Sequence, residues 1–311
     1  MLSTLNTTLP LFALIGCGYA AGRFRVLSPA GIGGLNTFVY YFALPAMLFR
    51  VMSQQPPQEV LDLPFMGAWL VVELCVFGAA LVGGWLVLRL TLPQSAVQAL
   101  GGVFANSGYM GLPLITTLLG QGAVVPVALT MVVDLTVMTA LTIVLIEVAR
   151  RGGGGLPRAL GVTLRAALLN PFVLSIWAGM AFAATSWELQ AGVFDFLGVL
   201  GSAATPCALF AIGGSLVGRN TLGSALPVST AVIMKLAVHP LLAAGVLLYW
   251  LPAPGDWAMA AVLVAALPTA GTVYVIAQRY GVFVAQASAT ILYSTVAGVV
   301  TFTLISFALL Q

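Results

Sequence analysis

A short polar stretch interrupts a long apolar region of the chain between Asn106 and Pro113. It reads NSGYMGLP and contains Asn106, Ser107, Gly108, Tyr109, Gly111 and Pro113. Amide and hydroxyl groups can donate hydrogen bonds to a ligand, whereas glycine and proline weaken a helix. The combination favours a binding site built on a broken helix, and Tyr109 could line its cavity.

A second interruption, ALPTAGT, runs from Ala266 to Thr272 and contains Pro268, Thr269 and Thr272. Helix N-termini carry partial positive charge and attract anions, so two helix breaks that meet would offer a ready anion site. The hydroxyls of Thr269 and Thr272 can add hydrogen bonds. We predict that the two interruptions together bind a small organic anion.

Ionisable residues also lie inside apolar stretches, namely Glu73, Asp134, Lys235 and His239. An intramembrane Asp or Lys costs about 2.5–3.5 kcal/mol on insertion scales and is a functional hypothesis by default. Isolated Asp134 is the first choice for a proton or cation site. Glu73 and Lys235 could act in coupling or gating, or simply pair. His239 precedes Pro240, and packing and proton handling both stay open.

Composition places these residues in a membrane protein. The 311 residues are 61% hydrophobic and only 6% charged, against roughly a quarter charged in soluble domains. The formal net charge of +3 comes from scattered basic residues, without the clustered stripe typical of nucleic-acid binding. Cys17, Cys75 and Cys207 lie in apolar segments and have no metal spacing with the single histidine. No nucleophile and base motif or metal site is apparent, so neither an enzyme nor a cofactor is expected.

Apolar runs separated by Gly, Pro and charge predict ten transmembrane helices, since a span takes about 20 apolar residues. Their approximate ranges are 8–24, 32–50, 64–88, 95–119, 123–148, 166–185, 193–217, 225–250, 256–278 and 283–310.

The distribution of basic residues predicts the orientation in a cell membrane. With the N-terminus outside, nine of the eleven basic residues fall in inner loops, and Arg50 and Lys235 are the exceptions. The nine are Arg23, Arg25, Arg89, Arg150, Arg151, Arg158, Arg165, Arg219 and Arg279. The positive-inside rule therefore favours both termini outside.

The chain also shows signs of an internal repeat. Pro45 begins PAMLF and Pro206 begins PCALF 161 residues later, while Gly18 and Gly179 share that separation. Leu112-Pro113 and Leu267-Pro268 are 155 residues apart, and Glu73 and Lys235 are 162 apart. Because each half holds five spans, the halves must run in opposite directions. We predict an inverted repeat of residues 1–149 and 165–311, joined by a basic cytoplasmic linker over 150–164.

Six segments resemble the auxin efflux carrier family, part of a wider group that includes bile acid symporters. They are LNTFVYYFALPAMLF (Leu35 to Phe49), NSGYMGLPL (Asn106 to Leu114), NPFVLSIWAG (Asn170 to Gly179), ATPCALFAIGGSL (Ala204 to Leu216), KLAVHPLL (Lys235 to Leu242) and ALPTAGTVYVIAQRYG (Ala266 to Gly281). The resemblance covers essentially the whole chain.

This resemblance implies an all-α fold of ten helices in two inverted five-helix repeats, with helices 4 and 9 broken at prolines and crossing in mid-membrane. It implies elevator-type transport of a small organic anion, with Asn106 facing the substrate, Pro113 and Pro268 marking the crossing, and Pro45 and Pro206 in crossover or packing positions. The family often has an asparagine where this chain has Thr272. That difference leaves the substrate open.

Two further functions remain open at the level of sequence. The first is a sodium-coupled symporter of the bile acid type for an amphipathic anion, and the second is a membrane sensor that binds a ligand without carrying it. The coupling ion could be a proton or sodium. Small-residue faces such as GAALVGG, Gly78 to Gly84, could pack helices within one chain or in a homodimer.

Overall fold

The computed structural model describes residues 2–55, 62–151, 161, 164–165, 168–185, 187–218, 225–251, 253 and 255–310. Apart from short connections and one isolated β-bridge, the described chain is helical. This is the expected result for so apolar a chain, because backbone groups in hydrocarbon must find their partners within the protein. Most of the predicted linker lies outside the described residues, as do Arg158 and Arg219.

Six helical segments of the described chain are long and apolar enough to cross a membrane. They are Pro29–Met52, Leu63–Val87, Gln121–Arg150, Ala191–Ser215, Ala225–Trp250 and Val284–Leu309. Four shorter apolar helices, Leu9–Arg23, Ser107–Leu119, Pro171–Ala183 and Gly255–Ala265, overlap the first, fourth, sixth and ninth predicted spans. The chain is therefore an all-α, multi-pass membrane protein.

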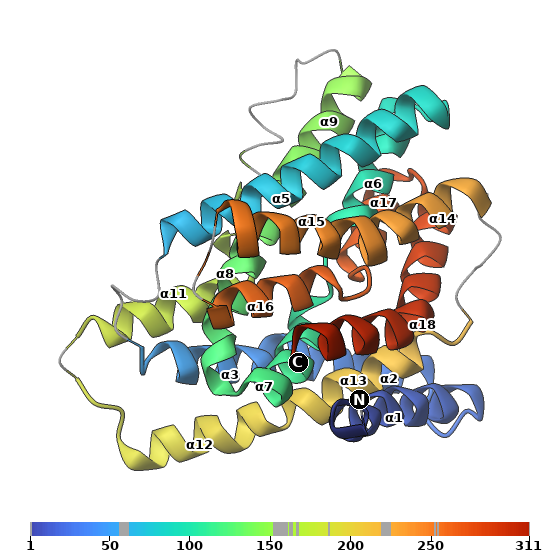
Figure 1. Cartoon of the computed structure of the whole chain (residues 1–311). Helices are drawn as coiled ribbons and strands as arrows, with labels where there is room; N and C mark the ends of the chain where they lie inside the picture. Colours follow the sequence, from blue (N-terminus) through green and yellow to red (C-terminus); the bar gives the residue numbers. More distant parts are fainter. Residues whose placement is uncertain are drawn as a thin grey trace. The chain divides into compact units, whose positions relative to one another are not determined.

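The chain divides into two compact units, each of which draws on both halves of the sequence (Figure 1). Unit 1 comprises Met1–Leu63, Gly108–Leu129 and Leu169–Gly218, and unit 2 comprises Pro64–Ser107, Thr130–Leu168 and Arg219–Gln311. This division is spatial, whereas the predicted division into residues 1–149 and 165–311 concerns a repeat in the sequence. The repeat and its orientation stay predictions.

Unit 1 pairs helices from the beginning of the chain with helices from its middle. Its helices are α1 (Leu2–Arg23), α2 (Pro29–Phe38), α3 (Leu44–Met52), α7 (Leu112–Leu119), α11 (Pro171–Ala183), α12 (Ala191–Ser202) and α13 (Ala204–Ser215). Helix α1 packs on α13, and α3 packs on α11 and α12. The sequence explains where α2 and α11 begin. The side chain of Ser28 accepts a hydrogen bond from Gly31 N, and that of Asn170 accepts one from Phe172 N. A proline follows each of these two residues at the first helical position.

Gly18 and Gly179, which are 161 residues apart, make equivalent close contacts in unit 1. A Cβ atom on Gly18 would lie 1.9 Å from the carbonyl oxygen of Phe210, and one on Gly179 would lie 2.9 Å from the carbonyl oxygen of Phe49. Phe49 and Phe210 are themselves 161 residues apart. The packing of α1 on α13 therefore has a counterpart in the packing of α11 on α3, and both depend on the absence of a side chain.

Unit 2 contains the helices that surround the two breaks. They are α5 (Leu63–Val82), α6 (Leu92–Val103), α9 (Thr139–Arg151), α14 (Ala225–Ile233), α15 (His239–Gly245), α16 (Gly255–Ala265), α17 (Thr272–Tyr280) and α18 (Val284–Leu309). Helix α5 starts at the last residue of unit 1, and α8 (Val124–Val133) crosses the boundary between the units.

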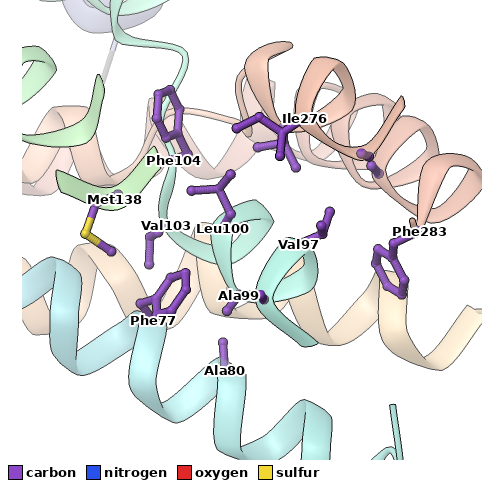
Figure 2. Close-up of a cluster of buried hydrophobic side chains, with 14 of the residues drawn as sticks. Phe77, Ala80, Val97, Ala99, Leu100, Val103, Phe104, Met138, Ile276 and Phe283 are labelled. Carbon is purple, nitrogen blue, oxygen red and sulfur yellow. The ribbon is translucent and has the colours of Figure 1, made fainter. Parts of the chain in front are cut away.

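A hydrophobic cluster holds α6 in the middle of unit 2. Figure 2 shows Phe77 of α5 and Ile276 of α17 directed toward the α6 side chains Leu100 and Val103. Leu100 and Val103 are fully buried. Apolar side chains pack around α6 as far as its last residue. This packing holds in place the end of the helix at which the break begins.

Candidate functional site

The first break separates α6 from the next helical segment. Helix α6 ends at Val103, Phe104 is extended with ψ 104°, and helical structure resumes with a π-helical turn at Ser107–Gly111. No proline lies between Val103 and Ser107. The backbone of this break instead pairs with residues far along the chain, since Asn106 N donates to Pro268 O.

The second break separates α16 from α17 and does contain a proline. Helix α16 ends at Ala265, α17 begins at Thr272, and Pro268 lies between them. Thr269 N does not bond back along the helix but donates to the hydroxyl of Ser294 at 3.1 Å. A proline lacks the N–H that a helix needs, so the break is encoded locally as well as held by α18.

The two breaks cross within unit 2. Ala105 and Thr269 form an isolated antiparallel bridge, Asn106 N donates to Pro268 O at 2.9 Å, and Ala270 N donates to Phe104 O at 3.0 Å. Backbone groups released by the breaks thereby satisfy one another, as they must away from water. We call this arrangement the crossing.

The predicted ligand-binding residues of unit 2 fall into two groups at the crossing. Thr269 is fully buried and donates its hydroxyl to Gly101 O at 2.7 Å, so it anchors the crossing. Ser107 is also buried, and its hydroxyl lies 3.5 Å from Ala105 O. Asn106 and Thr272 are half-buried, and their side chains form no hydrogen bond within the described part of the chain. These two are the side chains at the crossing that are open to a ligand.

The remaining predicted ligand-binding residues, Gly108, Tyr109, Gly111 and Pro113, belong to unit 1. Tyr109 donates its hydroxyl to Asn36 O of α2 at 3.2 Å, which fixes it within that unit. Pro113 does not mark the crossing, contrary to the prediction. It lies in the first turn of α7, where proline is tolerated because the first helical N–H groups have no intrahelical acceptor.

Pro45 and Pro206 are likewise absent from the crossing. Both belong to unit 1, Pro45 in the first turn of α3 and Pro206 in the first turn of α13. They lie four residues before Phe49 and Phe210, whose carbonyls face the close-packed glycines. Their positions fit packing rather than crossover.

The four predicted ionisable residues come together in unit 2, where each is no more than 1% exposed. Lys235 Nζ lies 3.1 Å from His239 Nδ1, and His239 Nε2 lies 3.2 Å from Glu73 Oε1, without the alignment of a directed hydrogen bond. Because the ammonium group is a donor, Nδ1 accepts, which leaves the ring proton on Nε2 toward Glu73. We call Glu73, Asp134, Lys235 and His239 the ionisable cluster.

Trp69 completes the cluster and was not singled out from the sequence. Its indole Nε1 donates to Asp134 Oδ1 at 3.0 Å, and its ring centroid lies 5.3 Å from that of His239. Trp69 precedes Glu73 by four residues, as Lys235 precedes His239, so each pair shares a helix face. This four-residue spacing is the feature of the sequence that could have identified Trp69.

Lys235 connects the ionisable cluster to the crossing. Its Nζ donates to Ala265 O at 2.7 Å, a carbonyl left without its usual helical partner because Thr269 N bonds to Ser294. A cation at the C-terminal end of a helix is also favoured by the helix dipole. Lys235 and Asp134 both lie in π-helical turns, Met234–Val238 and Asp134–Met138, a feature frequent at functional sites.

With the His239 imidazole neutral, the cluster holds two carboxyl groups against one ammonium group. Three carboxylate oxygens have no hydrogen-bond donor within the described chain: Glu73 Oε1, Glu73 Oε2 and Asp134 Oδ2. A buried carboxylate without a partner is costly, so this site is suited to hold an additional proton or cation.

Comparison with known proteins assigns the class of the chain. Residues 3–306 match the family model described as membrane transport protein. The chain therefore belongs to this family of transport proteins, which are not enzymes, and its resemblance to the auxin efflux carriers is confirmed.

Three relatives are informative. One from Rhizobium meliloti (strain 1021), named "Putative malonate transporter", is 36% identical over 97% of this chain and 95% of its own length. An "Uncharacterized transporter" from Methanothermobacter thermautotrophicus is 25% identical over 99% of both chains. The "Lysosomal cholesterol signaling protein" of Mus musculus is 28% identical over 75% of this chain but only 28% of its own length.

Proposed function

We propose that this chain is a secondary transporter of a small carboxylate, with malonate as the first substrate to test. The family assignment and the name of the Rhizobium meliloti relative support a carboxylate. The observation that carries the proposal is the crossing, where Asn106 N pairs with Pro268 O while the Asn106 side chain is left half-exposed.

The proposed binding site uses Asn106, Thr272 and the start of α17. Helix α17 begins directly after the second break, and its N-terminal end favours negative charge. Hydrogen bonds to a charged group contribute about 1.5–3 kcal/mol each. Two such side chains with a helix start suit a short carboxylate.

The proposed mechanism is elevator-type alternating access in a fold of ten helices arranged as two inverted repeats, with both termini outside. The reciprocal contacts of Gly18 with Phe210 and of Gly179 with Phe49 support the repeat. Moving one elementary charge across 100 mV is worth about 2.3 kcal/mol. Export of an anion from a negative interior thus needs no coupled ion, whereas accumulation of the anion inside does.

The ionisable cluster is the proposed place of coupling to a proton or sodium ion. Asp134→Asn keeps the acceptor for Trp69 Nε1 but removes the charge. In proteoliposomes we expect this variant to bind malonate yet lose its response to an imposed proton or sodium gradient. A variant that responds as the parent does would exclude Asp134 from coupling.

Binding is tested first by thermal unfolding of the purified protein with a panel of small carboxylates at two pH values. A ligand at about 100 times its dissociation constant stabilises by about 2.7 kcal/mol. We expect malonate to stabilise the parent but not Asn106→Ala. Stabilisation by bile-acid-like amphipathic anions, and not by short carboxylates, would instead favour the sodium-coupled symporter.

A further inference from the structure

A pocket of about 200 Å³ lies in unit 1. It is formed by the end of α3, the C-terminal half of α12, the start of α13, and residues around the end of α7. Its polar lining includes Arg50, Gln121 and Thr205, and its apolar lining includes Met47, Val51 and Leu197. No Asp or Glu is among its lining residues.

Arg50 supplies the charge of this pocket. Its guanidinium carbon lies 4.0 Å from the ring centroid of Phe194, and it would lie 3.4 Å from a Cβ atom on Gly198. The guanidinium therefore packs on α12, over the ring of Phe194 and next to Gly198, which has no side chain. A cation over an aromatic ring is held there by cation–π attraction.

The guanidinium has unused hydrogen-bonding capacity. Arg50 Nε is buried without an acceptor, and no ion pair of Arg50 is found among the described residues. An arginine stays charged, and a buried charged donor without a partner is costly. An anion in the pocket would supply the acceptor that Arg50 Nε does not find within the described chain.

The other polar side chains that line the pocket differ in whether they are free to bind a ligand. Thr116 and Ser202 also line the pocket, but their hydroxyls donate to the backbone at Leu112 O and Val199 O. The side chains of Gln121 and Thr205 form no hydrogen bond within the described part of the chain. In addition to Arg50, Gln121 and Thr205 can therefore donate hydrogen bonds within the pocket, whose lining also includes apolar side chains.

We propose that the Arg50 pocket is a second anion-binding site, which takes a carboxylate or phosphate group attached to a short apolar body. The fork of the guanidinium matches either group. Arg50 is one of the two basic residues outside the predicted inner loops, a placement that the positive-inside rule disfavours and that a bound anion would compensate. The site goes beyond the proposed transport site, because it stands whether or not the chain carries a substrate.

The test measures protection of a cysteine placed in the pocket. In full-length protein with Cys17, Cys75 and Cys207 changed to alanine, Ser202→Cys is labelled with sulfonatoethyl methanethiosulfonate in phosphatidylcholine nanodiscs. With malonate at about ten times its dissociation constant, we expect labelling to slow about ten-fold. Arg50→Gln should abolish the protection.

Two matched variants separate this site from others. Arg23 also lies in the last turn of its helix and is exposed, so Arg23→Gln removes the same charge and should keep the protection. Asn106→Ala, which removes the proposed transport site, should keep it too. Protection by phosphatidylglycerol in the nanodisc, but not by malonate, would identify a lipid headgroup as the anion.

Two results would overturn the proposal. One is equal protection in the parent and in Arg50→Gln. The other is a labelling rate that neither malonate nor phosphatidylglycerol changes in a protein that unfolds at the parent temperature.

Discussion

At the scale of single residues, the crossing separates side chains that hold the structure from those open to a ligand. Thr269 uses both its N–H and its hydroxyl within unit 2. Asn106 uses its backbone N–H, but its side-chain amide stays half-exposed. Residue type alone predicted both as ligand-binding, because a sequence does not show which hydroxyls are already engaged.

Asn106→Ala should therefore weaken malonate binding without weakening the fold. Loss of one hydrogen bond to a charged ligand costs about 1.5–3 kcal/mol, which corresponds to at least about a ten-fold rise in the dissociation constant. Equilibrium binding measures this directly, and the exposed amide variant Gln278→Ala is the control. Unchanged affinity in Asn106→Ala would remove the amide from the site.

Lys235→Met, unlike Asn106→Ala, should strongly destabilise the folded protein. It leaves Ala265 O without its donor and removes the positive charge that interacts electrostatically with Glu73 and Asp134. Removing one partner of a buried charge pair costs about 3–5 kcal/mol. Unfolding in detergent would measure the loss, and Glu73→Gln added to Lys235→Met should recover part of it. Equal stability of parent and Lys235→Met would refute this role.

Residue types alone predicted the members of the ionisable cluster but not that they meet. Charges in apolar spans are rare, so Glu73, Asp134, Lys235 and His239 were identifiable one by one. Their meeting was not, because it depends on how α5, α15 and the π-helical turns at 134–138 and 234–238 pack. Trp69 was missed because an aromatic residue in a membrane helix is usual.

At the scale of helices, the sequence predicted both breaks, but proline marked the position of only the second one. Pro268 does lie in its break, since a missing N–H disrupts a helix wherever it falls inside one. The other break precedes Pro113 and is held by pairing of Phe104 and Asn106 with residues far along the chain. Such long-range pairing leaves little local signal, which is why proline was a misleading guide there.

Close helix packing gives a prediction at the same scale. In α1, Gly18→Ala would place a methyl group 1.9 Å from Phe210 O, whereas a Cβ on Gly16 meets nothing within 4 Å. We expect Gly18→Ala to lower the unfolding temperature, because α1 and α13 must move apart. Gly16→Ala should be neutral or stabilising by up to about 1 kcal/mol. Similar effects of the two substitutions would contradict the packing of α1 on α13.

At the scale of the whole molecule, each spatial unit combines helices from both halves of the sequence. Hydrophobic runs predicted the helices, and matched prolines and glycines predicted a relation between the halves. The grouping into units could not be predicted from those patterns, because it reflects which helices contact one another.

The most direct test of the central claim is solute counterflow in proteoliposomes loaded with unlabelled malonate. A carrier should drive labelled malonate transiently above its external concentration, and Asn106→Ala should reduce this overshoot to near that of empty liposomes. The same overshoot in Asn106→Ala would move the substrate site away from the crossing. Binding of malonate without any overshoot would contradict transport and indicate a membrane sensor.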